Sequence, residues 1–247
     1  MSKATVGRGR WRALAGSLAL SVALASGVAG QAPGVDSTRS RSIASTRDAI
    51  AGVTALAGAF ALDHAVRTAV QRGRSSVGDD VATLANTFGS PLYVVPPLAA
   101  TYLVARLAHR PQLAATALRT GGAAVAAGLA TVVVKEAVGR ARPYQTPEAD
   151  VVRPFSGFTS FPSGHTAIAT AVAVSLAGGT NKWWAKALLY GGAGLTGLAR
   201  INDDKHWLSD VVAGAAVGIV AGRLSQRWHR PQPLVIGPGV VGLRIGF

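Results

Sequence analysis

The sequence of 247 residues has no cysteine, one methionine and few charged side chains, which make up 15% of the chain. The absence of cysteine excludes disulfide bonds, thiolate nucleophiles and cysteine-bound zinc. Ordinary soluble domains carry about 25% charged residues, so this chain is unusually apolar. Small residues are abundant instead: 30 are glycine, and alanine dominates many stretches. This composition suits closely packed helices, inside a membrane or outside one.

Acidic residues are scarce as well. The chain has 25 Lys and Arg against 11 Asp and Glu, a formal net charge of +14. A strongly basic chain can indicate nucleic-acid binding, but here the cations are spread along the sequence and no binding motif is present. Aromatic residues, which would stack on bases, make up only 6%. We therefore expect no nucleic acid, and instead a phosphorylated substrate or an anionic lipid surface.

The N-terminus has the pattern of a targeting segment. A basic head, MSKATVGRGRWR, precedes the small and apolar run ALAGSLALSVALASGVAG. This pattern predicts a signal peptide, or an uncleaved anchor helix, at 1–30. Polar, Ser- and Arg-rich residues predict a linker at 31–46. The main domain is then expected at 47–230, followed by a short β-like C-terminal tail at 231–247.

Six apolar segments rich in Ala, Val, Leu and Gly predict an all-α fold for the main domain. They are 47–62, 91–108, 112–137, 164–178, 183–200 and 207–224. A membrane-spanning helix needs about 20 mainly apolar residues, and several of these runs are shorter. The run AIAGVTALAGAFAL, for example, stops at Asp63. The sequence leaves open whether the helices span a membrane or form a buried core.

Three short stretches hold the residues best suited to chemistry. The first is KEAVGRARP, in which Lys135 and Arg142 are seven residues apart, or about two helical turns. Both cations can lie on one helix face at that spacing. Gly139 and Pro143 predict that the helix ends here and turns the second cation inward. Taken alone, the stretch is also typical of a basic helix end that complements the helix dipole.

The second stretch is FPSGHTAIA, where a helix is expected to begin. Ser163 is a candidate N-cap residue, and Gly164 lets the backbone approach a ligand closely. The first amides of the helix would then form an anion site. His165, in the first turn, would lie beside a bound anion and exchange a proton with it. Taken alone, the stretch is also typical of a plain helix cap.

The third stretch is ARINDDKHWLSD. His206 and Asp210 are four residues apart, so they share a helix face. Asp210 can accept a hydrogen bond from one imidazole nitrogen and leave the other free to attack. Arg200 needs a turn at INDD, residues 201–204, to return to the same pocket. Taken alone, the stretch also suits a surface Asp–His pair.

Together, the three stretches supply what phosphoryl transfer requires: cations for the phosphate oxygens, a nucleophile and an acid. The patterns Lys-x6-Arg-Pro, Pro-Ser-Gly-His and Arg-x5-His-x3-Asp resemble the signature of the type 2 phosphatidic acid phosphatase / vanadium-dependent haloperoxidase superfamily. The resemblance covers 135–143, 162–165 and 200–210, and implies a six-helix bundle of that kind. One position departs from the family pattern: Ala199 stands where the family usually has Ser.

The resemblance implies roles for eight residues. His206 would attack phosphorus and form a phosphohistidine, Asp210 would orient His206, and His165 would protonate the leaving group and then activate water. The phosphate-binding residues would be Lys135, Arg142, Ser163, Gly164 and Arg200. No cofactor or metal is expected, and the remaining histidines, His64, His109 and His229, lack the spacing of metal ligands.

The expected function is therefore that of a metal-independent phosphomonoesterase acting on a lipid or isoprenoid phosphate. Two alternatives remain: a haloperoxidase that uses vanadate as its cofactor, and an envelope protein with a vestigial site. The expected location is the cell envelope, either periplasmic or membrane-associated, with an extracytoplasmic active site. If a signal peptide were cleaved and all six helices spanned, however, the site would face the cytoplasm. The sequence names neither the substrate nor the oligomeric state.

Overall fold

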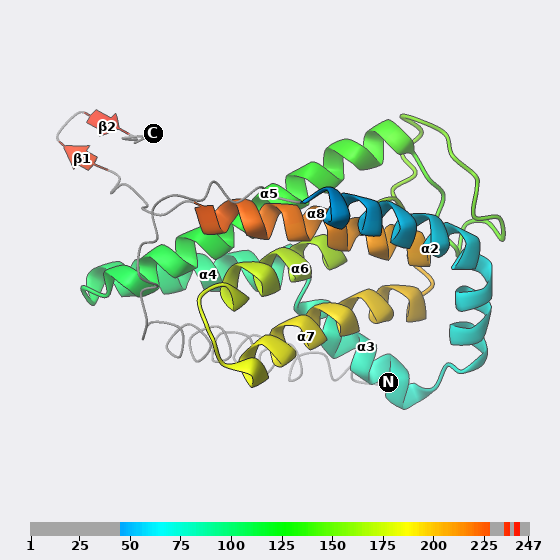
Figure 1. The fold of residues 1–247 in the computed structure, drawn as a ribbon, viewed down its shortest axis with the longest axis horizontal. Helices are drawn as coiled ribbons and strands as arrows, with labels where there is room; N and C mark the ends of the chain where they lie inside the picture. The colour runs from blue at the N-terminus through cyan, green and yellow to red at the C-terminus, as the bar shows by residue number, and fades with distance from the viewer. Residues whose placement is uncertain (1–44, 228–234, 238–239, 243–247) are drawn as a thin grey trace, which may run out of the picture.

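The computed structural model describes residues 45–227, 235–237 and 240–242. The predicted signal or anchor segment, most of the linker and most of the tail lie outside these residues. The described part contains seven helices, shown in Figure 1. They are α2 (Thr46–Arg72), α3 (Ser76–Thr87), α4 (Pro91–Leu107), α5 (Pro111–Val138), α6 (Gly164–Ala177), α7 (Trp183–Asn202) and α8 (Leu208–Arg227). Two short strands, β1 (Val235–Gly237) and β2 (Val240–Gly242), pair antiparallel.

All six predicted segments are helical, but the prediction of six helices was wrong because α3 was missed. Helix α3 starts after Ser75, whose side chain accepts a hydrogen bond from the amide of Gly78 at 3.1 Å. Its sequence, SVGDDVATLANT, has two adjacent aspartates and buries only Ala82 and Ala85. A short helix with so narrow an apolar face leaves little periodic signal in the sequence.

Helix α6 forms the centre of the bundle and packs against α5, α7 and α8 (Figure 1). Ten of its 14 residues are buried. The core around it consists largely of alanine, including Ala127, Ala167 and Ala171, which are all fully buried. Such small side chains allow helix backbones to approach one another closely.

Helix α8 approaches α6 through glycines spaced four residues apart: Gly214, Gly218 and Gly222. A Cβ atom at Gly218 would lie 2.5 Å from the carbonyl oxygen of Ala167. A Cβ atom at Gly214 would overlap the carbonyl oxygen of Ser163, at the start of α6. The glycines thus set the distance between the beginnings of α6 and α8, where two of the predicted site motifs lie.

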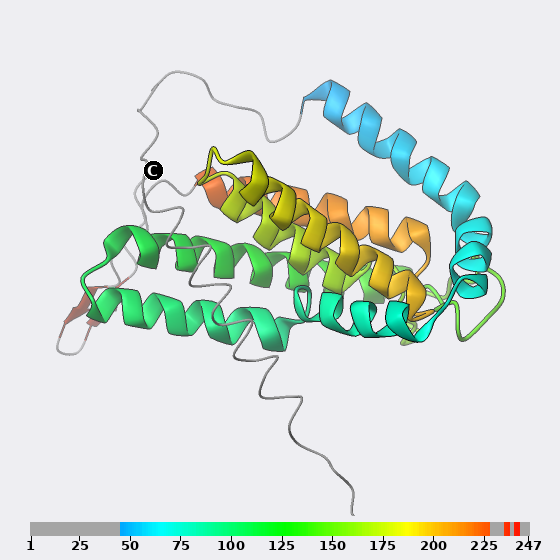
Figure 2. The same ribbon diagram turned by 90° about the horizontal axis from the view of Figure 1, so that it is seen from below.

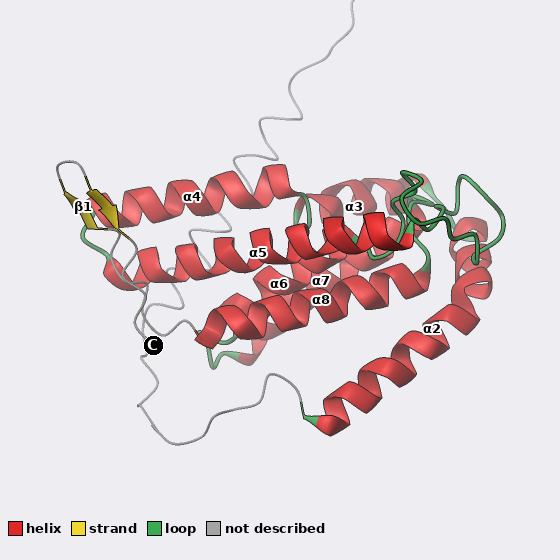
Figure 3. Ribbon diagram, turned by 90° about the horizontal axis from the view of Figure 1, so that it is seen from above, coloured by secondary structure: helices red, strands yellow, loops and turns green. Residues whose placement is uncertain are grey.

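Helices α4 and α5 form a hairpin on one side of the bundle (Figure 2), and α2 lies along the outside (Figure 3). Helix α2 buries only Ala59 and Asp63. The loops that follow α2, α5 and α7 gather at one end of the bundle, on the right in Figure 3. The loop of residues 139–163 covers that end and precedes α6.

Three described helices are long and apolar enough to cross a membrane, namely α2, α5 and α8. Helices α3 and α4, bent by 42° at a short break, pass the same test as a pair. Large apolar side chains are exposed along these helices: Val53 on α2 is 70% exposed, and Val133 on α5 is 69% exposed. An apolar surface of this extent supports association with a membrane.

The glycine contacts between α6 and α8 predict opposite effects of two alanine substitutions. Gly218→Ala would place a methyl group 2.5 Å from the carbonyl oxygen of Ala167, so we expect it to lower the free energy of unfolding by about 1–3 kcal/mol. Gly194→Ala, on α7, meets no atom within 4 Å and should leave stability unchanged or raise it by up to about 1 kcal/mol. Thermal unfolding in detergent measures both, and equal melting temperatures would contradict the close packing.

Candidate active site

The chain leaves α5 through a sharp turn between the two cations of the first motif. Gly139 adopts a left-handed conformation (φ 61°), and a Cβ atom there would overlap the carbonyl oxygen of Arg153. The helix end predicted at Gly139 is therefore confirmed. Lys135 and Arg142 accordingly do not share a helix face, because Arg142 lies beyond the end of α5.

Lys135 and Arg142 nevertheless converge on the end of the same loop. The Lys135 ammonium group donates to the carbonyl oxygens of Thr159 and Ser160, and Arg142 Nη2 donates to Thr159 Oγ1 at 3.0 Å. A Cβ atom at Gly164 would lie 3.9 Å from Lys135 Cε. The first cation of the motif is thus packed against the first residue of α6.

Ser163 occupies the N-cap position of α6, as predicted, but its side chain makes no capping hydrogen bond. Its hydroxyl instead accepts from Thr166 Oγ1 at 2.9 Å, and its amide donates to the carbonyl oxygen of Asp210 at 2.9 Å. The first amides of a helix have no acceptor within the helix. Because the Ser163 hydroxyl does not cap them, the amides that begin α6 remain available to an anion.

The third motif closes back on itself between α7 and α8. The amides of Lys205 and His206 donate to the carbonyl oxygen of Arg200 at 3.1 and 3.2 Å, so Arg200 and His206 are adjacent. The predicted turn at 201–204 was placed too early, because α7 continues to Asn202 and the turn occupies 203–207. Asp204 has a left-handed backbone (φ 57°) within that turn.

Asp210 lies in the first turn of α8 with its carboxylate beside His206. The distance from His206 Nδ1 to Asp210 Oδ2 is 3.5 Å, and both side chains are buried. Asp210 Oδ2 also accepts from the amide of Trp207 at 2.8 Å and from Ser160 Oγ at 2.5 Å. The Asp–His pair is therefore held inside the protein rather than on its surface.

Three buried side-chain nitrogens have no hydrogen-bond partner within the described residues. They are Arg142 Nε, Arg200 Nε and His206 Nδ1. Buried polar atoms in native proteins are nearly always paired, so each exception calls for an explanation. All three belong to the set of predicted site residues. The two guanidinium nitrogens are donors, as an oxyanion site requires.

The two histidines are neutral at physiological pH in this environment. Burial, together with the nearby Arg200, His206, Lys205 and Lys135, lowers the pKa of His165 to about 3. Burial also lowers the pKa of His206 to about 4, against the opposing effect of Asp210. Because Lys135 and Arg200 act on both imidazoles, the site is positively charged and suited to an anion.

Sequence reasoning missed the residues that hold the site residues in place. Asn86, on the unpredicted α3, accepts from Arg200 Nη1 at 3.0 Å and donates to Asp203 Oδ2 at 2.9 Å. Asp63, read from the sequence as the end of an apolar run, is buried and paired with Arg140 at 2.7 Å. Arg140 also pairs with Asp210 at 2.7 Å. A lone carboxylate within an apolar run and the extra arginine in GRARP were the available signals.

Ala199, where the resemblance led us to expect Ser, is buried against Ala82 and Ala85 of α3. The position therefore serves the packing of α7 on α3 in this chain. No group of three or more His, Cys, Asp or Glu side chains able to hold a metal ion occurs among the described residues.

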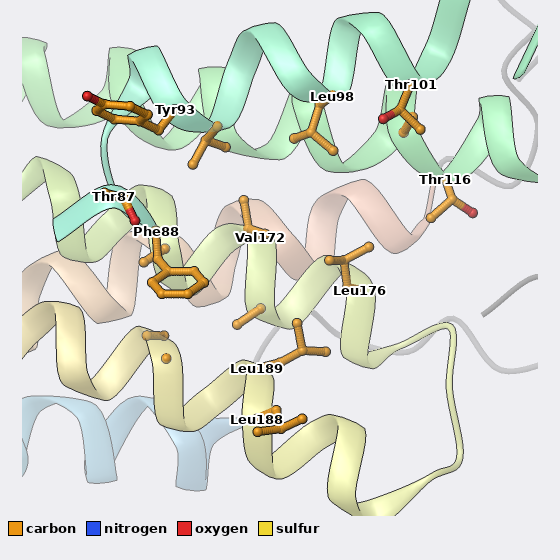
Figure 4. Close-up of a pocket in the computed structure, with 16 residues that line it drawn as sticks. Thr87, Phe88, Tyr93, Leu98, Thr101, Thr116, Val172, Leu176, Leu188 and Leu189 are labelled. Atoms are coloured by element: carbon orange, nitrogen blue, oxygen red, sulfur yellow. The ribbon is translucent and has the colours of Figure 1, made fainter. Parts of the chain in front are cut away.

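An apolar cavity of about 200 Å³ lies between α4, α5, α6 and α7, with Thr87 and Phe88 at one end (Figure 4). Along α6 it is lined by Ala169, Val172, Ala173 and Leu176. Ala169 is one helical turn beyond His165, so the cavity begins about 6 Å from the site along the axis of α6 and continues away from it.

Comparisons with known proteins show that part of this chain is similar to one protein family. Residues 116–233 match the family model of the PAP2 superfamily. Over 67 residues the chain is 48% identical to a lipid A 1-phosphatase of Porphyromonas gingivalis, a match that covers 26% of this chain and 15% of that protein. The chain therefore matches only a small part of the length of that relative.

Two solved structures have a similar fold. LpxE of Aquifex aeolicus is 23% identical, with a TM-score of 0.50 over 67% of this chain and 95% of that one. A transmembrane PAP2-type phosphatidylglycerolphosphate phosphatase of Bacillus subtilis is 18% identical, with a TM-score of 0.56 over 87% of this chain and 94% of that one. The family match spans the three motifs and the residues between them. The part of the chain that contains the three motifs is thus similar to the PAP2 superfamily.

Proposed function

We propose that this protein is a metal-independent phosphomonoesterase that acts on a membrane lipid phosphate through a phosphohistidine intermediate. The observation that carries the proposal is the convergence of three cations, the buried His206 and the half-buried His165 at the start of α6. Lys135 packs against Gly164, and Arg200 is adjacent to His206. Such a cage of cations stabilises the charge on a phosphoryl group in the transition state of its transfer.

In the first step, Nε2 of His206, the ring nitrogen that does not face Asp210, attacks phosphorus. The bond from phosphorus to the alcohol oxygen breaks. Asp210, 3.5 Å from Nδ1, stabilises the positive charge that His206 gains. His165 gives a proton to the leaving alkoxide. In the second step, His165 accepts a proton from water, the water oxygen attacks phosphorus, and inorganic phosphate leaves as the bond to His206 breaks.

The low pKa of His165 must rise before it can act as an acid. Burial is the main cause of this low pKa, and the cationic neighbours Arg200, Lys205 and Lys135 add to it. A bound phosphate dianion offsets the charge of these neighbours. An anion beside an imidazole favours its protonated form. Substrate binding therefore favours protonation of His165, so that His165 can act as an acid only when a phosphate is bound.

Two observations support a lipid as the substrate. The relative from Porphyromonas gingivalis carries the name lipid A 1-phosphatase, and the apolar cavity is lined along α6 from Ala169, one helical turn beyond His165, to Leu176. A hydrocarbon tail in this cavity would leave its phosphate at the N-terminus of α6. On this account the protein lies in the membrane of the cell envelope, with its site at the extracytoplasmic surface. No observation favours the haloperoxidase or the vestigial protein.

The nucleophile assignment predicts that His206→Ala lowers kcat by roughly 10⁴-fold or more, because no other side chain can form the covalent intermediate. Rapid acid-free quenching with ³²P-labelled substrate should show labelled protein for the wild type and none for the variant. His109→Asn is a matched control, since His109 lies between α4 and α5 with φ 53°, a conformation that Asn accepts. Labelled His206→Ala protein, or unchanged turnover, would reject the mechanism.

The metal-free chemistry predicts that dialysis against EDTA leaves the turnover unchanged. Orthovanadate, which resembles phosphate in shape and charge, should inhibit competitively by occupying the same cage. Steady-state kinetics with and without chelator measure both effects. If EDTA abolishes the activity and a divalent ion restores it, the reaction requires a metal ion and the metal-free mechanism is wrong.

The cavity predicts a dependence on the length of the substrate's tail. Gly192 lines the cavity, and a Cβ atom there meets nothing within 4 Å. Gly192→Leu should fill the space and lower kcat/KM by about 10-fold for long-chain substrates, with little effect on short-chain ones. Gly191→Leu is the control, because Gly191 is equally open but lies outside the cavity. If both substitutions change kcat/KM equally for long-chain and short-chain substrates, the cavity does not bind the tail of the substrate.

A further inference from the structure

We propose that Asp63 and Arg140 are positioning residues for the phosphoryl transfer, forming with Asp210 a buried charged network that keeps Asp210 directed at His206. The inference rests on the proposed function. It assigns a role in the reaction to α2, a helix that holds none of the three sequence motifs.

The network is a chain of short ion pairs. Arg140 Nη1 donates to Asp210 Oδ1 at 2.7 Å, and Arg140 Nη2 donates to Asp63 Oδ2 at 2.7 Å. The side chains of Asp63 and Asp210 are fully buried, and that of Arg140 is 2% exposed. One guanidinium group thus bridges a carboxylate of α2 and a carboxylate of α8.

The remaining hydrogen-bonding positions of the network are also occupied. The amide of Ser209 donates to Asp63 Oδ1 at 2.8 Å, and its hydroxyl donates to Asp63 Oδ2 at 2.7 Å. Arg140 Nε donates to the carbonyl oxygen of Ala149 at 2.8 Å. The guanidinium carbon also lies 5.6 Å from the ring centre of Trp207, the residue after His206. Asp210 therefore has little freedom to rotate away from His206.

Burying three charged groups is expensive, and a well-packed apolar set is often as stable. The charge balance of the network indicates its function, which is to place negative charge beside His206. Two carboxylates and one guanidinium leave a net charge of −1 beside His206, which becomes positive when it binds phosphorus. Because Asp63 shares Arg140, Asp210 is not fully neutralised by its own ion pair. Without Asp63, Arg140 would act on Asp210 alone and weaken its effect on His206.

The other charged groups around His206 act in the opposite direction. Lys135 from α5 and Arg200 from α7 both disfavour its positive charge, and His165 from α6 lies close by. In the proposed mechanism, Lys135 and Arg200 bind the phosphate. Asp210 is the only carboxylate among the groups that act on His206 in the described residues, so control of Asp210 amounts to control of the nucleophile.

The test compares variants of the full-length protein in detergent. Asp63→Asn keeps the shape of the side chain and removes one negative charge, and we expect kcat to fall about 10- to 100-fold, as for other residues that orient a ligating or reacting histidine. Asp80→Asn on α3 is the matched control, because it makes the same change at an exposed carboxylate outside the network. Its kcat should remain within a few-fold of the wild type.

A second measurement separates positioning from a merely structural role. NMR titration of labelled histidine should show that Arg140→Gln raises the pKa of His206, since both carboxylates then act on it without a cation. Adding Asp63→Asn to that variant should return the pKa toward the wild-type value. This comparison does not require Asp63→Asn to fold alone.

The outcomes distinguish the two proposals. If Asp63→Asn lowers only the melting temperature, with kcat and the His206 pKa unchanged, the network is structural and the inference is wrong. Equal pKa values in Arg140→Gln and in the double variant would also overturn it. Failure of the proposed function would appear separately, as a wild-type protein without phosphatase turnover, whereas the pKa comparison needs no activity.

Discussion

The structure of the site depends on the surroundings of one residue, Asp210. Its carboxylate contacts Arg140, Ser160 and the amide of Trp207, and its backbone carbonyl accepts from the amide of Ser163. These contacts join the loop after α5, the start of α6 and the start of α8. A displacement of this carboxylate would disturb His206 and the start of α6 together, because both are fixed to the same residue.

The packing of the helices makes these contacts possible. Gly214 has no side chain to separate α8 from the carbonyl oxygen of Ser163, which a Cβ atom would overlap. The amide of Ser163 can then reach Asp210 at 2.9 Å. The abundance of small residues is thus connected to the proposed chemistry, because it brings the start of α6, which carries His165, close to the start of α8, which follows His206.

Local patterns in the sequence predicted much of this structure. The end of α5 at Gly139 and the start of α6 after Ser163 follow from residue types whose preferences are local, and both were predicted correctly. Residues with obvious chemistry, such as His206, could be named as candidates from the sequence, and their roles stay predictions. Helix α3 was missed because its apolar face consists of only two buried alanines, and with it the contact of Asn86 to Arg200.

The residues that sequence reasoning missed act across long separations. Asp63 and Arg140 are 77 positions apart, and nothing in the spacing of either indicates the other. A lone carboxylate in an apolar run reads as an interruption until a partner is known. Only the fold, which brings α2 against the loop after α5, identifies the pair as complementary.

The central claim is that the three motifs form one cage around a tetrahedral oxyanion, with His206 as the nucleophile. An experimental structure with bound orthovanadate tests it most directly. The account predicts vanadium bonded to the ring of His206, with its oxygens in hydrogen-bonding range of Lys135, Arg142 and Arg200. Vanadate bound away from His206, or held without contact to these cations, would contradict the account.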